Sequence, residues 1–200
     1  GWLPIYDEEK KEVLHAGINY RYGKTENDEI KLRSRPEVNA APYFIDTGTF
    51  PSDHSNHLGF ELYYRKGSFM VGTETYAHMF HSLEAKNPTF YGGDIMMSYF
   101  LTGETRPYIT DKSIFGFVPV SRSIFKGGPG AWEVLLRYSA YDLTSGNIQG
   151  GQLWRITPMV NWYLCNSIRL EIAYGYGVLD RYQMKGGTQF FQSRIQFTLP

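Results

Sequence analysis

Three cations alternate along one short stretch of the chain. Lys31, Arg33 and Arg35 are separated by Leu32 and Ser34, so a β-strand over residues 29–35 places all three on one face. No acidic residue stands between them. A guanidinium presents paired, charge-assisted hydrogen bonds to an oxyanion such as phosphate. The spacing therefore predicts a face that binds anions.

Further arginines alternate with apolar residues in other stretches of the chain. They are Arg21, Arg65, Arg137, Arg155, Arg169 and Arg194, and on the same predicted faces stand the acids Glu61, Glu74, Asp94, Glu133 and Glu171. If the apolar faces meet lipid, the opposite faces line a lumen with net positive charge, which concentrates anions. The alternative is that these charges pair across strands as ordinary sheet contacts. The sequence leaves both interpretations open.

The elements that position these charges are extended segments with strict alternation of apolar and polar residues. About ten such segments of roughly 9–12 residues follow one another, the length of tilted membrane strands. They begin with residues 12–22, 29–35 and 43–45, and the last carries Phe191, Ile195, Phe197 and Leu199 on its apolar face. Short turns, such as Lys66-Gly67, are expected at one end and longer loops, such as 142–151 and 179–187, at the other. This pattern predicts an all-β fold, a transmembrane antiparallel β-barrel with residues 1–200 in one domain.

Composition agrees with this fold class. The chain has 16 Tyr, 13 Phe and 21 Gly, which suits strands, interfacial aromatic rings and tight turns. Apolar runs are far shorter than the roughly 20 residues that a membrane-spanning helix needs. Lys plus Arg (20) balance Asp plus Glu (20), so no net field favours nucleic acid. A soluble β-sandwich remains an alternative, with the apolar faces turned inward.

Several blocks of residues occur in an order that resembles one known family. They are Trp2-Leu-Pro-Ile-Tyr-Asp, His15-Ala-Gly-Ile-Asn-Tyr-Arg, Arg33-Ser-Arg-Pro-Glu37, Phe44-Ile-Asp-Thr-Gly48, Tyr99-Phe-Leu-Thr-Gly-Glu-Thr-Arg-Pro-Tyr108, Gly130-Ala-Trp-Glu-Val-Leu-Leu-Arg-Tyr-Ser139 and Gln192-Ser-Arg-Ile-Gln-Phe197. Together they are similar to the phosphate-selective porin O/P family over nearly the whole chain. Blocks in the right order are more specific than any one block.

The resemblance implies a trimeric, sixteen-stranded barrel in the outer membrane of a Gram-negative bacterium. About ten strands are expected in this chain, so about six N-terminal strands are expected to lie outside it, since a barrel leaves no open edge in lipid. A complete ten-stranded barrel is the competing possibility. The expected function is passive diffusion of small anions, phosphate among them, with outer-membrane lipid and a homotrimer as partners and no cofactor or nucleic acid. A docking barrel with little conductance is the alternative.

The connection over residues 102–129 is long and irregular. It carries the cations Arg106, Lys112, Arg122 and Lys126. The family resemblance implies that inward-folded segments narrow the channel, so these cations are candidates for a constriction. A plug or rim element with purely structural contacts is the alternative interpretation.

Enzymatic chemistry finds little support in the sequence. Asp53, His54 and His57, or His78 and His81, could be imagined as metal ligands, but neither set is a convincing metal-binding motif. His78 with Ser98 is a faint candidate for a hydrolase pair without an evident orienting residue. We therefore expect no metal, no catalytic residue and no enzyme activity.

Overall fold

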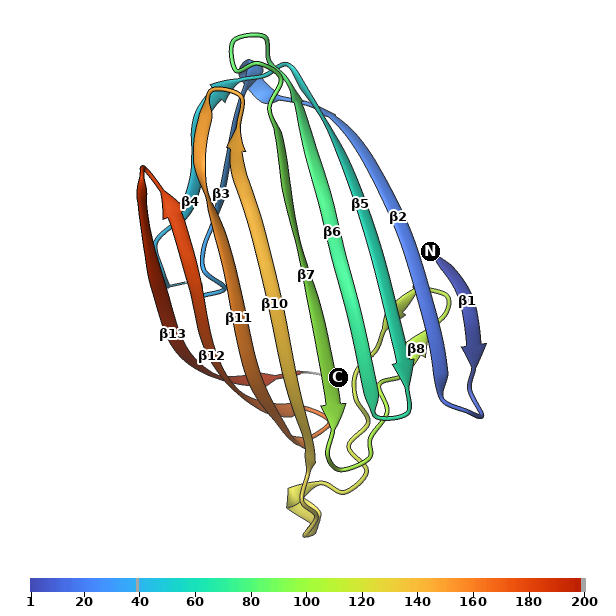
Figure 1. Ribbon diagram of the computed structural model, residues 1–200. Helices are drawn as coiled ribbons and strands as arrows, with labels where there is room; N and C mark the ends of the chain where they lie inside the picture. Colours follow the sequence, from blue (N-terminus) through green and yellow to red (C-terminus); the bar gives the residue numbers. More distant parts are fainter. Residues whose placement is uncertain (39, 199–200) are drawn as a thin grey trace.

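The wall of the molecule is one curved antiparallel sheet. The computed structural model describes residues 1–38 and 40–198, and within them nine strands pair in the order β1-β2-β5-β6-β7-β10-β11-β12-β13. These wall strands are β1 (Trp2–Asp7), β2 (Glu12–Lys24), β5 (His54–Lys66), β6 (Phe69–His81), β7 (Thr89–Phe100), β10 (Ala131–Ser145), β11 (Ile148–Cys165), β12 (Ile168–Arg181) and β13 (Met184–Phe197). The sheet curves around an interior without closing on itself (Figure 1).

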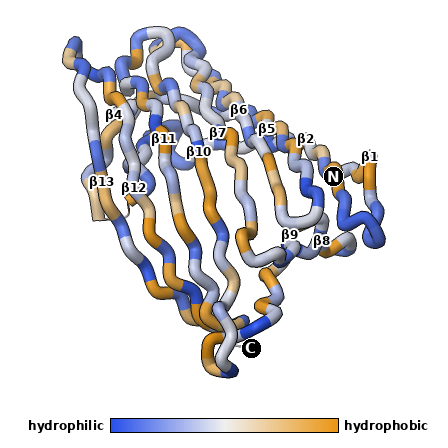
Figure 2. The backbone as a smooth tube through the Cα atoms, turned by 60° about the horizontal axis from the view of Figure 1, so that its bottom comes forward, coloured by the Kyte–Doolittle hydropathy of each residue, from blue (hydrophilic) through white to orange (hydrophobic). Residues whose placement is uncertain are grey.

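Most wall strands have an apolar outer face and a mostly polar inner face. On β5, Leu58, Phe60 and Leu62 are exposed, whereas Arg65 is buried on the opposite face. The register continues this division from strand to strand, since Phe60 faces Thr75 and Glu61 faces Glu74. The alternation is visible as changing colour along β10, β11 and β12 (Figure 2). Exposed apolar side chains over the outside of the sheet are expected where a wall faces lipid.

The predicted all-β fold is confirmed, with changes in which segments form the wall. Residues 29–35 and 43–45 were expected to be wall strands, but the strands they contribute to, β3 (Glu29–Ser34) and β4 (Ile45–Pro51), pair only with each other. The unpredicted strand β1 lies in the wall instead. It is an edge strand, where Pro4 can be accommodated although it lacks a backbone N–H. The predicted face position Leu199 lies outside the described residues.

The predicted division into short turns at one end and long loops at the other is wrong. At the upper end in Figure 1, tight turns join β10 to β11 and β12 to β13, because the strands extend through the expected loops 142–151 and 179–187. The upper end also carries the insertion between β2 and β5. The glycines of 142–151 predicted a loop, but Gly150 lies within β11, where a Cβ would come 2.5 Å from the Leu143 carbonyl oxygen.

Residues 29–51, here called the inserted hairpin, follow the 3₁₀ turn η1 (Glu26–Asp28) and enter the interior from the upper end (Figure 1). Ile30 and Leu32 pack on a core that also contains Ile45 and Phe50 of β4. The wall supplies the rest of this core: Phe80, Ala85, Phe90, Leu143, Ile148 and Leu153. The apolar face of the hairpin thus packs against the wall, and its polar face points away from this core.

Residues 102–129, here called the lower segment, join β7 to β10 at the lower end. This segment contains the short strands β8 (Tyr108–Ile109) and β9 (Ile114–Phe115) and the 3₁₀ turn η2 (Ile124–Lys126). Val118 packs with Phe100, Ala131 and Tyr163 in a second core. Within the described residues, no helix is long and apolar enough to cross a membrane.

A first prediction concerns the outer face. Ile172 is half-exposed on β12, and we expect the Ile172→Arg substitution to lower the free energy of unfolding from phospholipid vesicles by about 2–4 kcal/mol, the usual cost of a cation on the lipid face near the bilayer midplane. The matched control is Gln192→Arg, because Gln192 on β13 pairs with Ala173 on the inner face. Denaturant unfolding in vesicles measures both. Equal effects of the two substitutions would contradict the assignment of faces.

Candidate functional site

The inserted hairpin carries the three alternating cations on its exposed face. Lys31, Arg33 and Arg35 are exposed, whereas the intervening Leu32 and Ser34 are partly buried. The prediction that the three share a face agrees with this geometry, but their strand lies inside the wall and is not part of it. Any solute passing the hairpin on this side therefore meets cations first.

The three cations differ in their partners. Lys31 forms an ion pair with Asp46 of β4, with 3.3 Å between Nζ and Oδ2. Arg33 and Arg35 lie over the ring of Tyr43 instead, with guanidinium carbons 4.1 and 4.0 Å from its centroid. Across residues 1–38 and 40–198, neither arginine has a carboxylate oxygen within 4.0 Å. Their charges remain available to an external anion, and cation–π contacts hold both groups in place.

Glu37 fixes the tip of the hairpin to the wall. Its carboxylate accepts hydrogen bonds from Ser139 Oγ at 3.2 Å and Thr157 Oγ1 at 2.7 Å. Arg137 lies 3.4 Å away as an ion-pair partner. These three partners come from the inner faces of β10 and β11, so a single side chain joins the hairpin to the middle of the wall.

Two wall arginines hold the hairpin through its backbone. Arg155 is 2% exposed and donates to the carbonyl oxygen of Pro36 and, at 3.1 Å, to Thr188 Oγ1. Arg181 donates to the carbonyl oxygens of Phe44 and Asp46, at 3.2 and 2.8 Å. The buried guanidinium of Arg155, predicted to line the pore, therefore serves as an anchor in this structure.

Three other predicted pore-lining arginines pair with acids of the same inner face. Arg137 donates to Asp94 at 2.6 Å. Arg169 and Arg194 both contact Glu171, at 3.3 and 2.9 Å. Cross-strand pairing of this kind was the alternative interpretation of the inner charges, and for these arginines it agrees with the geometry. Their charge is offset locally and adds little to a field in the lumen.

The last two predicted wall arginines have no ion pair among the described residues. Arg21 is exposed on the inner face of β2, where it pairs in register with His57. Arg65 is 5% exposed, and its Nε has no hydrogen-bond partner. Arg21 can meet a solute, whereas the burial of Arg65 limits its access.

The cations of the lower segment separate into one that is paired and three that are exposed. Arg106 bonds to both carboxylate oxygens of Glu133, at 3.0 and 3.2 Å. Glu133 is 1% exposed and also accepts hydrogen bonds from Asn161 and Tyr163. Lys112 is exposed between β8 and β9, Lys126 lies in η2, and Arg122 precedes it. The turn η2, which includes Lys126, projects below the strand ends (Figure 1), so this part of the lower segment does not narrow the interior of the wall.

The amino-acid sequence of this chain matches a known family. Residues 2–199 match the family of phosphate-selective porins O and P. The chain belongs to this family. Membership in a family of porins agrees with the all-β wall described above.

The chain is also similar in sequence to two individual proteins. The chain is 30% identical over 169 residues to an uncharacterized protein of Caulobacter vibrioides, covering 84% of this chain and 34% of the relative. It is 24% identical over 224 residues to Porin O of Pseudomonas aeruginosa, covering 92% of this chain and 49% of that protein. The chain thus spans about a third to a half of the length of these two relatives.

The suggested hydrolase pair is not assembled in this porin-family chain. In the register, His78 faces His57 and Phe90, whereas Ser98 faces Met70. His78 and Ser98 therefore lie towards opposite ends of the wall. The sequence suggested two metal-binding groups, one with His54 and His57 and the other with His78 and His81. Neither forms as suggested, because His54 pairs with His81 and His57 pairs with His78 across the two strands.

Sequence reasoning missed the residues that position the hairpin. The sequence did not predict that Glu37, Tyr43 and Arg181 hold the hairpin in place. Glu37 entered the sequence analysis only as part of the family-like block Arg33-Ser-Arg-Pro-Glu37. One signal in the sequence could have indicated this role: the acid Glu37 follows the three cations directly, after Pro36. Only the fold shows that this acid reaches Ser139 and Thr157, more than 100 residues away.

A second prediction tests the anchor. The Glu37→Ala substitution removes two hydrogen bonds to a charged group and one ion pair, which lowers the free energy of opening the hairpin by about 1.5–3 kcal/mol. Limited trypsin digestion after Lys31 and Arg33 should then be at least about tenfold faster, because cleavage follows the population of the open state. Glu29→Ala, at an exposed glutamate of the same strand, is the control and should leave the rate unchanged. Equal digestion of the two variants would refute the anchor.

Proposed function

We propose that this chain forms part of an outer-membrane channel of a Gram-negative bacterium, through which small anions such as phosphate diffuse passively. The Arg33–Arg35–Tyr43 cluster of the inserted hairpin is its selective element. The proposal is supported by family membership together with two unneutralised guanidiniums exposed on the inner hairpin. A planar guanidinium makes paired hydrogen bonds to phosphate oxygens.

The contacts of the inner wall indicate that a few free cations select the solute, and not a continuous row of arginines along the wall. Arg137, Arg169 and Arg194 are paired with acids, so the fixed positive charge that a solute can reach is concentrated on the hairpin and at Arg21. A focused field at one position favours entry of anions while leaving no deep trap along the path. Lys112 adds an exposed cation near the lower end.

Closure of the wall is part of the same proposal. The outer strands β1 and β13 have unpaired edges, which cannot face the hydrocarbon region of a bilayer. We expect strands outside this chain to complete the barrel, which the family resemblance implies to be sixteen-stranded and trimeric. A docking barrel with little conductance has no specific observation in its favour.

The test is phosphate block of the single-channel chloride current. In the double variant Arg33→Ala/Arg35→Ala, phosphate block should require at least about tenfold more phosphate, since each lost charge-assisted hydrogen bond contributes about 1.5–3 kcal/mol. The measurement uses the complete protein in planar bilayers, with phosphate titrated at fixed chloride.

The matched control is Arg194→Ala, which removes an inner-face arginine already paired with Glu171. It should leave phosphate block nearly unchanged. If the control weakens block as much as the double variant does, selectivity is a property of the whole wall. If neither variant alters block, the hairpin cluster is not the selective element.

A further inference from the structure

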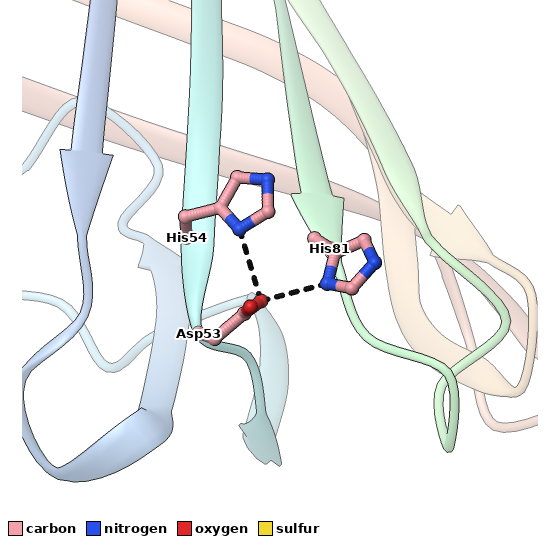
Figure 3. Close-up of side chains that lie close together, drawn as sticks. All are labelled: Asp53, His54 and His81. Atoms are coloured by element: carbon pink, nitrogen blue, oxygen red, sulfur yellow. Dashed lines mark hydrogen bonds and ion pairs between the residues drawn. The ribbon is translucent and has the colours of Figure 1, made fainter.

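Three potential metal ligands meet at the upper end of the wall, outside the proposed anion path. Asp53 directly precedes β5, His54 is the first residue of β5, and His81 is the last residue of β6 (Figure 3). One ligand atom from each lies within 4.8 Å of the other two. Asp53 Oδ1 is 2.8 Å from His81 Nδ1 and 3.1 Å from His54 Nδ1.

The backbone around these residues holds them in position. His54 and His81 are direct cross-strand partners, and their rings stack 4.8 Å apart. The buried Ser52 donates its hydroxyl to the carbonyl oxygens of both histidines, at 3.0 and 3.1 Å. The carbonyl oxygen of Asp53 accepts from the Thr25 backbone N–H at 3.1 Å. Convergence of the three side chains therefore does not depend on a flexible loop.

The chemistry of the set suits a borderline divalent cation. Two imidazole nitrogens and one carboxylate oxygen form a set common for Zn²⁺, with a further position left for water. Bonds of about 2.0–2.2 Å in a tetrahedral arrangement place ligand atoms roughly 3.3 Å apart, so small rotations of the partly exposed side chains suffice. An aspartate carboxylate is ordinarily ionised at neutral pH, as coordination requires.

We propose that Asp53, His54 and His81 bind one divalent transition-metal ion, with Zn²⁺ as the best match, on the outer face of the upper end of the wall, the face that also carries Leu58 and Phe60. The ion replaces the two imidazole-to-carboxylate hydrogen bonds with coordination bonds through His54 Nδ1, His81 Nδ1 and an Asp53 oxygen, and each neutral imidazole then carries its proton on Nε2. A doubly charged cation on a singly charged carboxylate changes the net charge of this cluster from −1 to +1.

The neighbouring histidine pair provides a matched comparison. His57 and His78 face each other on the same two strands, with ring centroids 4.3 Å apart. The metal-capable set found in the described residues contains neither of them. A site made merely by two adjacent histidines would involve both pairs equally, whereas the proposed site needs Asp53.

The experiment is calorimetric titration of zinc chloride into the EDTA-stripped full chain in detergent micelles. We expect one saturable Zn²⁺ per chain. Asp53→Asn and His81→Gln should each weaken binding by about 100-fold or more, because loss of an outer-shell partner alone typically costs 10–100-fold. Asp53→Asn keeps the size of the side chain and can still accept from His81, so folding should be retained; circular dichroism verifies this.

The control His78→Gln should leave zinc affinity unchanged. Absence of saturable zinc uptake by the unmodified chain would overturn the proposal, as would full-affinity uptake by Asp53→Asn. An equal loss in His78→Gln would place binding at another site. Since no current is measured, these outcomes are independent of whether the channel selects anions.

Discussion

The contact between Glu37 and the inner wall determines where the charged face of the inserted hairpin lies. Ser139 and Thr157 donate to this carboxylate, and Arg137 lies beside it as an ion-pair partner. With the tip held in this way, the apolar side of the hairpin packs on the wall and the opposite side presents Arg33 and Arg35. A partly buried carboxylate with satisfied hydrogen bonds is costly to displace, so the arrangement favours a fixed hairpin over a mobile loop.

The structure also separates arginines that support the fold from arginines that can meet a solute. Arg155 is buried and bonded to the hairpin backbone, and Arg194 shares Glu171 with a neighbouring arginine. Breaking such pairs leaves a charge without its partner, which is why an inner-face arginine is not automatically a binding residue. The exposed cluster on Tyr43 is different, because its partner is a ring and carries no opposite charge.

Much of the wall could be predicted from the sequence, because alternation with a period of two assigns each side chain to a face once a strand is recognised. Leu58, Phe60 and Glu61 lie on the faces expected for them. The same rule could not separate β3 from a wall strand, since an inserted hairpin packed on one side has the same alternation. The pairing of Arg137 with Asp94, and the meeting of Asp53 with His81, depend on register between strands, which local sequence does not specify.

The most direct test of the account is the reversal potential of the complete, unmodified protein in planar bilayers under a potassium chloride gradient. If Arg33 and Arg35 govern which ions pass, the reversal potential lies near the chloride equilibrium potential, and phosphate at millimolar concentration or below reduces the current. A reversal potential near zero, or on the potassium side, would contradict the account and indicate a general diffusion pore.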